Sequence, residues 1–159
     1  MTTFALAGSA AYGSNNNAGV TVVEAIFDCS DIDGAGTTVT SGDIIQAINV
    51  PANTFVQLVR CEVVTVEGGA GTIDVGVTGS NAAGFFNDLD VNALTDSVAG
   101  PVSLTEGTPN TVTGYSGGTY FTSSDTIDIL ANANLNVAQI RLVAVLVDLN
   151  GKRKFSWGS

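Results

Sequence analysis

Histidine is absent from the 159-residue sequence. This excludes catalytic triads that use a histidine base, imidazole proton shuttles and imidazole metal sites. Cations are scarce as well, with five Lys and Arg against fifteen Asp and Glu and a formal net charge of −10. A surface this acidic repels phosphate groups, so we expect no nucleic-acid partner.

Cysteine and long apolar runs are also rare. Cys29 and Cys61 each lie in an apolar stretch, and we interpret both as small buried hydrophobic residues, with a disulfide as the less favoured alternative. The longest apolar run, residues 142–147, is far shorter than the roughly 20 residues of a membrane-spanning helix. The first residues lack the positive charge of a signal peptide. We therefore expect a soluble chain with no membrane partner and no export signal.

Residues that favour β-strands and turns are abundant. The chain has 20 Val, 9 Ile and 18 Thr, whose branched side chains fit a pleated sheet, and 19 Gly, which suit tight turns. Eight strands are predicted, at residues 20–28, 44–50, 55–67, 72–78, 102–105, 119–122, 125–130 and 138–149. Eight strands without helical periodicity predict an all-β fold, an antiparallel β-sandwich, with jelly roll as the preferred topology.

Local patterns refine this fold. Apolar residues switch from even to odd positions within residues 55–66, which predicts a bulge near residues 58–60. Residues 79–118 contain many Gly and Pro, and we expect long loops around short strands there. Asp125 and Asp128 are expected to face water, whereas residues 137–149 are apolar on both faces, unlike a strand with one wet face.

The predicted organisation is one domain with two extensions. Residues 1–19 are small and polar, so we expect an N-terminal arm or loop. The β-sandwich domain covers residues 20–150, and residues 151–159 form a basic and aromatic tail.

Clusters of acidic and aromatic residues were weighed as sites. Asp28, Asp31 and Asp33 fit no complete calcium loop, and we favour a solvated turn. Residues 88–92 match the start of an EF-hand loop, but Ala93 replaces its glycine. We predict no metal site, no cofactor and no catalytic residue. A sugar-stacking platform is an open alternative for four aromatic residues, Tyr115, Tyr120, Phe121 and Trp157.

The C-terminal tail carries the sharpest signal. Three of the five cations stand at residues 152–154, so residues 1–151 have a net charge of −13. A solvated tail is one interpretation. The functional interpretation is an arm whose cations meet an acidic protein while its aromatic rings fill pockets on that protein. The candidate partner-binding residues are Lys152, Arg153, Lys154, Phe155 and Trp157.

Five sequence blocks, in order, resemble small virion proteins of tailed bacteriophages. The blocks are residues 42–54, 71–78, 85–92, 124–129 and 140–149. Similar phage proteins include jelly-roll capsid decoration, or cement, proteins, often trimeric, which sit on the outer capsid lattice and clamp neighbouring major capsid subunits. The resemblance implies a noncatalytic protein on the head surface of the virion, assembled in the host cytoplasm, with a homotrimer and the major capsid protein as partners.

Two other functions remain open at this point. One is a receptor- or glycan-binding module of a phage tail or head fibre, which would require Tyr115, Tyr120 and Trp157 to lie coplanar and exposed. The other is a hydrolase that uses an opposed pair of carboxylates. The sequence does not fix the geometry that either function needs.

Overall fold

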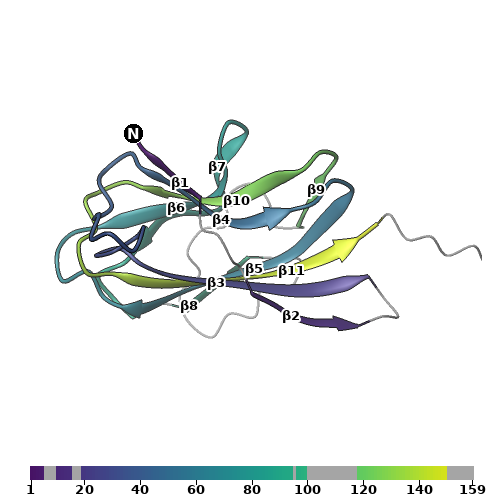
Figure 1. Cartoon of the computed structure of the whole chain (residues 1–159), viewed down its shortest axis with the longest axis horizontal. Helices are drawn as coiled ribbons and strands as arrows, with labels where there is room; N and C mark the ends of the chain where they lie inside the picture. The colour runs from purple at the N-terminus through teal and green to yellow at the C-terminus, as the bar shows by residue number, and fades with distance from the viewer. Residues whose placement is uncertain (6–9, 16–18, 95, 100–117, 150–159) are drawn as a thin grey trace, which may run out of the picture.

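Two β-sheets stacked face to face form the fold (Figure 1). The computed structural model describes residues 1–5, 10–15, 19–94, 96–99 and 118–149. Every regular element among these residues is a strand. The same residues contain no helix of the length and hydrophobicity required to cross a membrane. The all-β sandwich is thus confirmed.

The sheets are named here after their central strands. The β10 sheet has the order β1 (Thr3–Ala5), β4 (Ile44–Val50), β10 (Asp125–Ala131), β6 (Thr72–Val77) and β7 (Asn81–Asp90). The β11 sheet has the order β2 (Ala10–Asn15), β3 (Val20–Asp28), β11 (Gln139–Asp148) and β5 (Thr54–Thr65). Two short strands, β8 (Asp96–Ala99) and β9 (Thr119–Phe121), both pair with the outer edge of β5.

The strand order is that of a jelly roll. With β1 and β2 set aside, the β11 sheet reads β3, β11, β5 and then β8 with β9, and the β10 sheet reads β4, β10, β6 and β7. The chain crosses from one sheet to the other between β3 and β4, β4 and β5, β5 and β6, β7 and β8, β9 and β10, and β10 and β11. This is the double Greek key of a jelly roll, which confirms the expected topology.

The N-terminal residues extend both sheets. In the segment expected as an arm or loop, β1 pairs in parallel with β4 and β2 pairs antiparallel with β3. The Thr2 N–H donates to Asp43 Oδ1 at 2.6 Å, which fixes the start of β1. Because β3 and β4 face each other across the sandwich, both added strands lie on the same side.

The loop expected over residues 79–118 is in part wrong, since it contains β7 and β8. Strand β7 lacks an alternating pattern because its pairing with β6 is irregular. Val75 lies opposite Phe86 and Val77 opposite Asn81, so the four residues between Asn81 and Phe86 have no place in the ladder. Both Phe85 and Phe86 are buried as a result. The strand predicted at residues 102–105 lies outside the described residues.

The predicted bulge in β5 is confirmed, one residue before the expected range. Val145 lies opposite Leu58 and Leu146 opposite Val56, so Gln57 has no partner on β11. An extra residue in one strand reverses the faces that follow it. The buried residues are therefore at even positions up to Val56 and at odd positions from Val59 onward.

The core fills the space between the sheets. Both cysteines are fully buried and free, as expected. Burial raises the pKa of each thiol to about 12, so neither is a nucleophile at neutral pH. The largest fully buried side chains are Phe85, Phe86, Ile45, Ile48, Ile73, Leu89, Ile127, Ile129, Leu135, Ile140, Leu142 and Val39.

Candidate interaction surface

The central strand β11 carries apolar residues on both faces, as the sequence predicts. Ile140, Leu142 and Ala144 face inward and are fully buried. The residues between them, which include Val143 and Val145, face outward and are partly exposed. An outer sheet face exposed to water normally alternates to polar residues, so this strand departs from that rule.

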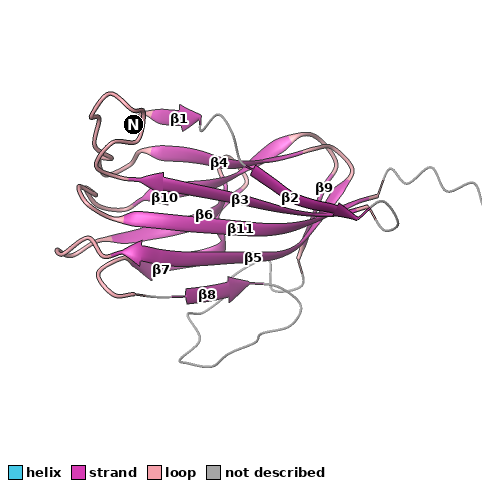
Figure 2. Ribbon diagram, turned by 60° about the horizontal axis from the view of Figure 1, so that its bottom comes forward, coloured by secondary structure: helices cyan, strands magenta, loops and turns pink. Residues whose placement is uncertain are grey.

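Neighbouring strands continue the apolar surface on the outside of the β11 sheet. Val147 lies between Val20 of β3 and Phe55 of β5, and Val145 lies between Val22 and Leu58. Directly opposite residues point to the same face of a sheet. Tyr120 of β9 lies opposite Phe55 and extends the row. These seven residues form what we call the valine patch, namely Val20, Val22, Phe55, Leu58, Tyr120, Val145 and Val147. Figure 2 shows the three long strands that carry it side by side.

A row of charged residues borders the valine patch on the same face. Arg141 Nε lies 2.6 Å from Glu24 Oε1, and Arg141 Nη1 lies 3.6 Å from Glu62 Oε2. Arg60 Nη2 lies 3.6 Å from the same Glu62 oxygen. Arg60 also holds Asp96 through two hydrogen bonds of 2.7 Å. We call these five residues the charge ladder, and it joins β3, β11, β5 and β8.

The charge ladder leaves its arginines neutralised. The hydrogen bond from Arg60 lowers the pKa of Asp96 below its usual value, and the hydrogen bond to Asp96 raises the pKa of Arg60. Arg60 and Arg141 are the two cationic side chains among the described residues, and both face carboxylates. The ladder fixes the arrangement of these five side chains and presents no free positive charge. Partly exposed ion pairs of this kind contribute little net stability.

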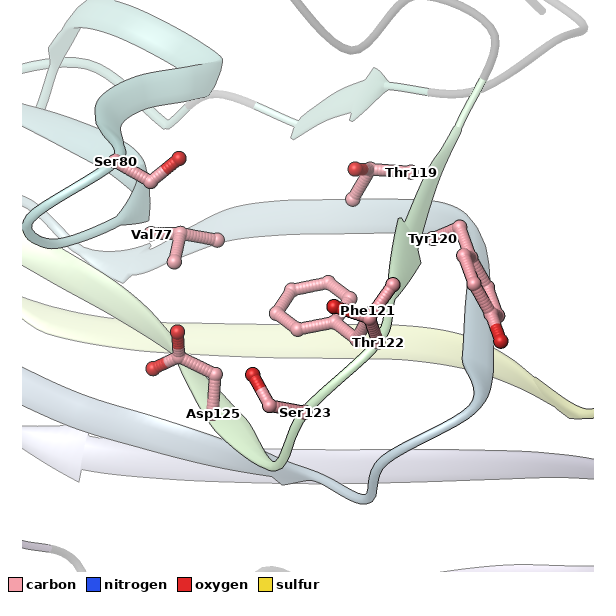
Figure 3. Close-up of a pocket in the computed structure, with 8 residues that line it drawn as sticks. All are labelled: Val77, Ser80, Thr119, Tyr120, Phe121, Thr122, Ser123 and Asp125. Carbon is pink, nitrogen blue, oxygen red and sulfur yellow. The ribbon is translucent and has the colours of Figure 1, made fainter.

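A small polar hollow lies at the end of the sandwich near β9 (Figure 3). Its volume is about 190 Å³. Val77 and Phe121 supply apolar surface, and the side chain of Asp125 lies at one end. Four hydroxyl groups also line it, from Ser80, Thr119, Thr122 and Ser123.

The hollow does not contain the aromatic platform that the sequence left open. Phe121 is 7% exposed and belongs to the core, so its assignment to a stacking surface is wrong. Tyr120 is 47% exposed, and its hydroxyl donates to Asn53 Oδ1 at 2.9 Å. Figure 3 shows its ring at the margin, away from Val77 and Asp125. Tyr115 and Trp157 lie outside the described residues.

Comparisons with known proteins found matches among solved structures alone. No family model and no curated protein sequence matches the chain. Chains in solved structures do match, and two of them come from phage capsids. A chain in the acid-stable capsid of Helicobacter pylori bacteriophage KHP30 is 17% identical, with a TM-score of 0.52 over 80% of this chain and 86% of that one. A chain in the capsid of Ralstonia phage GP4 is 15% identical, with a TM-score of 0.50 over 86% and 89%. At these identities the likeness shows a shared fold.

The acidic cluster after β3 is a set of turns whose carboxylates accept hydrogen bonds from their own loop. Asp31 Oδ1 accepts the Gly36 N–H at 2.6 Å, and Asp33 accepts the Ala35 N–H and the Thr37 hydroxyl. The hydrogen bond from Thr37 lowers the pKa of Asp33. Within the described ranges, no three His, Cys, Asp or Glu side chains come together as a possible metal site.

Asp128 does not face water, so that expectation is wrong. Its side chain is 3% exposed, and its Oδ2 accepts the Thr78 N–H at 3.1 Å. The reason is the irregular start of β7, whose backbone at Asn81 and Ala82 lies directly over Gly76, the residue opposite Asp128. Asp125, by contrast, is exposed as expected.

The candidate partner-binding residues of the tail, Lys152, Arg153, Lys154, Phe155 and Trp157, lie outside the described residues. Sequence reasoning did not identify the charge ladder. Glu24 and Arg141 are far apart in the sequence, and only the order of strands in the sheet brings them together. The available signal in the sequence was that Arg60 and Glu62 alternate with apolar residues, which indicates that both side chains point away from the core.

Proposed function

We propose that this chain is a noncatalytic structural protein of a bacteriophage virion. More specifically, it is a capsid decoration (cement) protein that binds the outer head surface as a homotrimer and stabilises contacts between major capsid subunits. The observation that carries the proposal is the likeness of most of the chain to chains in two phage capsids. The resemblance of five sequence blocks to phage virion proteins led to the same expectation.

The described surface suits a protein that works by contact. A cement protein must cover apolar and charged surface on its neighbours and keep its own shape. The valine patch supplies apolar area that burial against another protein would stabilise. The charge ladder fixes side chains in one arrangement across four strands, which suits a rigid contact surface.

The basic tail is proposed as the capsid anchor. Lys152, Arg153 and Lys154 give the tail three positive charges on a chain whose remainder has a net charge of −13. An acidic patch on the major capsid protein would attract these cations, and pockets there would take Phe155 and Trp157. In the sequence the tail comes shortly after β11, the central strand of its sheet.

Reconstitution on capsids tests the proposal. Purified protein is added to heads of the phage that carries its gene after removal of the native copies, and cryo-electron microscopy measures occupancy. We expect ordered density for the wild type on the outer surface. Deletion of residues 152–159 should lower occupancy while the circular dichroism spectrum stays unchanged. A second variant, in which Gln replaces each of residues 152–154, removes the three charges and keeps both aromatic residues. It therefore separates the contribution of charge to occupancy from that of the aromatic contacts.

Two results would contradict the proposal. Absence of wild-type density on the heads would reject the decoration role. Unchanged occupancy of the deletion variant would reject the tail as the anchor but leave the role itself in place.

The hollow beside β9 favours a second candidate, a glycan-binding module of a phage tail or head fibre. Its four hydroxyl groups and Asp125 are groups that form hydrogen bonds with sugar hydroxyls. A glycan array of the wild type, compared with Asp125→Asn, tests it. Binding that Asp125→Asn abolishes would support this function, and an array without hits would reject it.

A further inference from the structure

We propose that the valine patch is the surface through which one copy of this chain packs against another copy in the oligomer. This inference rests on the proposed function, because the homotrimer supplies the second copy. It assigns the copy-to-copy contact to the exterior of the β11 sheet and not to the basic tail.

The first step is the apolar character of the face. Val145 and Val147 are flanked on both sides by apolar residues, so the patch runs without a polar break from β3 across β11 to β5 and β9. Burial of apolar surface contributes roughly 25 cal/mol per Å². A contiguous apolar surface of this kind on a sheet exterior marks an interaction site.

The second step is electrostatic, and it identifies the occupant. Every copy is strongly acidic, so two copies repel each other over most of their surfaces. Among the described residues, the exterior of the β11 sheet is the surface that holds the arginines, so its acidic charge is offset there. Both arginines of the described residues lie there, and they pair with three carboxylates. A second copy can therefore approach this face more easily than the loops that carry Asp31 and Asp33.

A cationic partner fits the face poorly. The carboxylates of Glu24, Glu62 and Asp96 already pair with arginines. A basic protein would find exposed carboxylates with no arginine beside them elsewhere among the described residues, for example those of Asp31 and Asp33. A partner whose contact face is apolar and uncharged is the matching occupant, and the valine patch of a second copy is such a face.

The test is a matched pair of substitutions on the two sheet exteriors. Val145→Lys places a cation in the middle of the valine patch. Leu130→Lys makes the same change on β10, whose Leu130 is also partly exposed on the outside of its sheet. Both variants make the chain less acidic, so neither weakens association through added negative repulsion. Sedimentation velocity at micromolar concentration measures the oligomeric state.

We expect the wild type and Leu130→Lys to remain oligomeric and Val145→Lys to sediment as a monomer. If Val145→Lys does not fold, the milder Val145→Thr replaces it, and it should raise the dissociation constant about tenfold, or about 1.4 kcal/mol. A monomeric wild type, or an oligomer unaffected by the change at residue 145, would overturn the inference.

Two further measurements separate the alternatives. Deletion of residues 150–159 should leave the oligomer intact, and its dissociation on deletion would overturn the inference in favour of the tail. Capsid occupancy of Val145→Lys is measured in parallel. A monomeric variant that still binds heads would support the inference together with the proposed function, whereas oligomers that never bind heads would reject the function alone.

Discussion

At the scale of single residues, a few polar groups hold the loops at one end of the sandwich. The Glu67 side chain is 8% exposed and links the loop after β5 to the loop before β11. Its Oε1 accepts the Asn136 N–H at 2.7 Å, and its Oε2 accepts the N–H groups of Val137 and Ala138 at 3.0 and 2.9 Å. One carboxylate thus satisfies three consecutive backbone donors.

Replacing Glu67 by Gln should lower the free energy of unfolding by about 3 kcal/mol. The amide places an NH₂ group where an oxygen now accepts backbone N–H groups, and at least one buried donor loses its partner. Urea unfolding measures the change. Glu62→Gln is the control, since Glu62 lies in a partly exposed ion pair worth less than about 1 kcal/mol. Equal losses in the two variants would contradict the role of Glu67.

The same carboxylate predicts a pH dependence. Burial alone would raise the pKa of Glu67, but hydrogen bonds from Val137, Asn136 and Ala138 outweigh it and hold the pKa below its usual 4.5. A lowered pKa in the folded state gives stability that is present above the unfolded value and is lost as the pH falls through the folded value. The melting-temperature difference between wild type and Glu67→Gln should therefore narrow below about pH 4.5. A difference that stays constant down to pH 3 would reject this.

Gly76 should tolerate no side chain. A Cβ there would meet the backbone of Asn81 and Ala82, at the start of β7 beside β6. The added methyl group of Gly76→Ala must displace this backbone of β7 from its place over Asp128. We expect the free energy of unfolding to fall by about 3 kcal/mol. Gly69→Ala is the matched control, because nothing lies within 4 Å of its Cβ position. Thermal unfolding of both variants compares them, and equal melting temperatures would contradict the close approach.

At the scale of elements, the sequence predicts strands whose pattern is regular and misses strands whose pairing is not. Residues 20–28 and 44–50 coincide with β3 and β4 because their apolar runs end at clear turn residues. Strand β7 escapes prediction because two adjacent phenylalanines are both buried where its ladder breaks. The periodicity of apolar residues indicates which face of a strand is buried only where the strand pairs regularly with its neighbours.

The edge strand beside β5 is divided into two collinear pieces. Ala99 of β8 lies opposite Val59, and Thr119 of β9 lies opposite Val56. Only two positions of β5 separate these pairs, although 19 residues of the chain lie between Ala99 and Thr119. In the sequence, residues 100–117 lie between two short strands that pair with the same edge of β5.

This division predicts that residues 100–117 can be removed. If one glycine replaces them, that glycine and Gly118 connect Ala99 to Thr119 and span the two positions of β5 that lie between their partners. Shortening a connection reduces the entropy of loop closure, so the free energy of unfolding should rise by up to about 2 kcal/mol. Urea unfolding tests the shortened chain. A clear loss of stability would mean that the removed residues support the core.

At the scale of the whole molecule, the acidic loops are separated from the C-terminal end of β11. The loops after β3 and β5 carry Asp31, Asp33 and Glu67 at the end of the sandwich where β11 begins. Strand β11 ends at the opposite end, and the cationic tail follows it. The sequence predicts the tail and the two-faced strand, because both are local patterns. It could not predict the valine patch, because that surface exists only after β3, β5 and β9 align with β11.

This separation makes the response to salt a test of which surface joins the copies. If the valine patch does so, salt should strengthen association, because it screens the repulsion between copies of charge −10. The screening length falls from about 30 Å at 0.01 M to about 3 Å at 1 M ionic strength. Sedimentation equilibrium across that range should therefore show a falling dissociation constant for the wild type. Attraction between the basic tail and the acidic loops of a neighbour would give the opposite trend, since screening weakens unlike charges. A dissociation constant that rises with salt would thus move the contact from the β11 sheet to the tail.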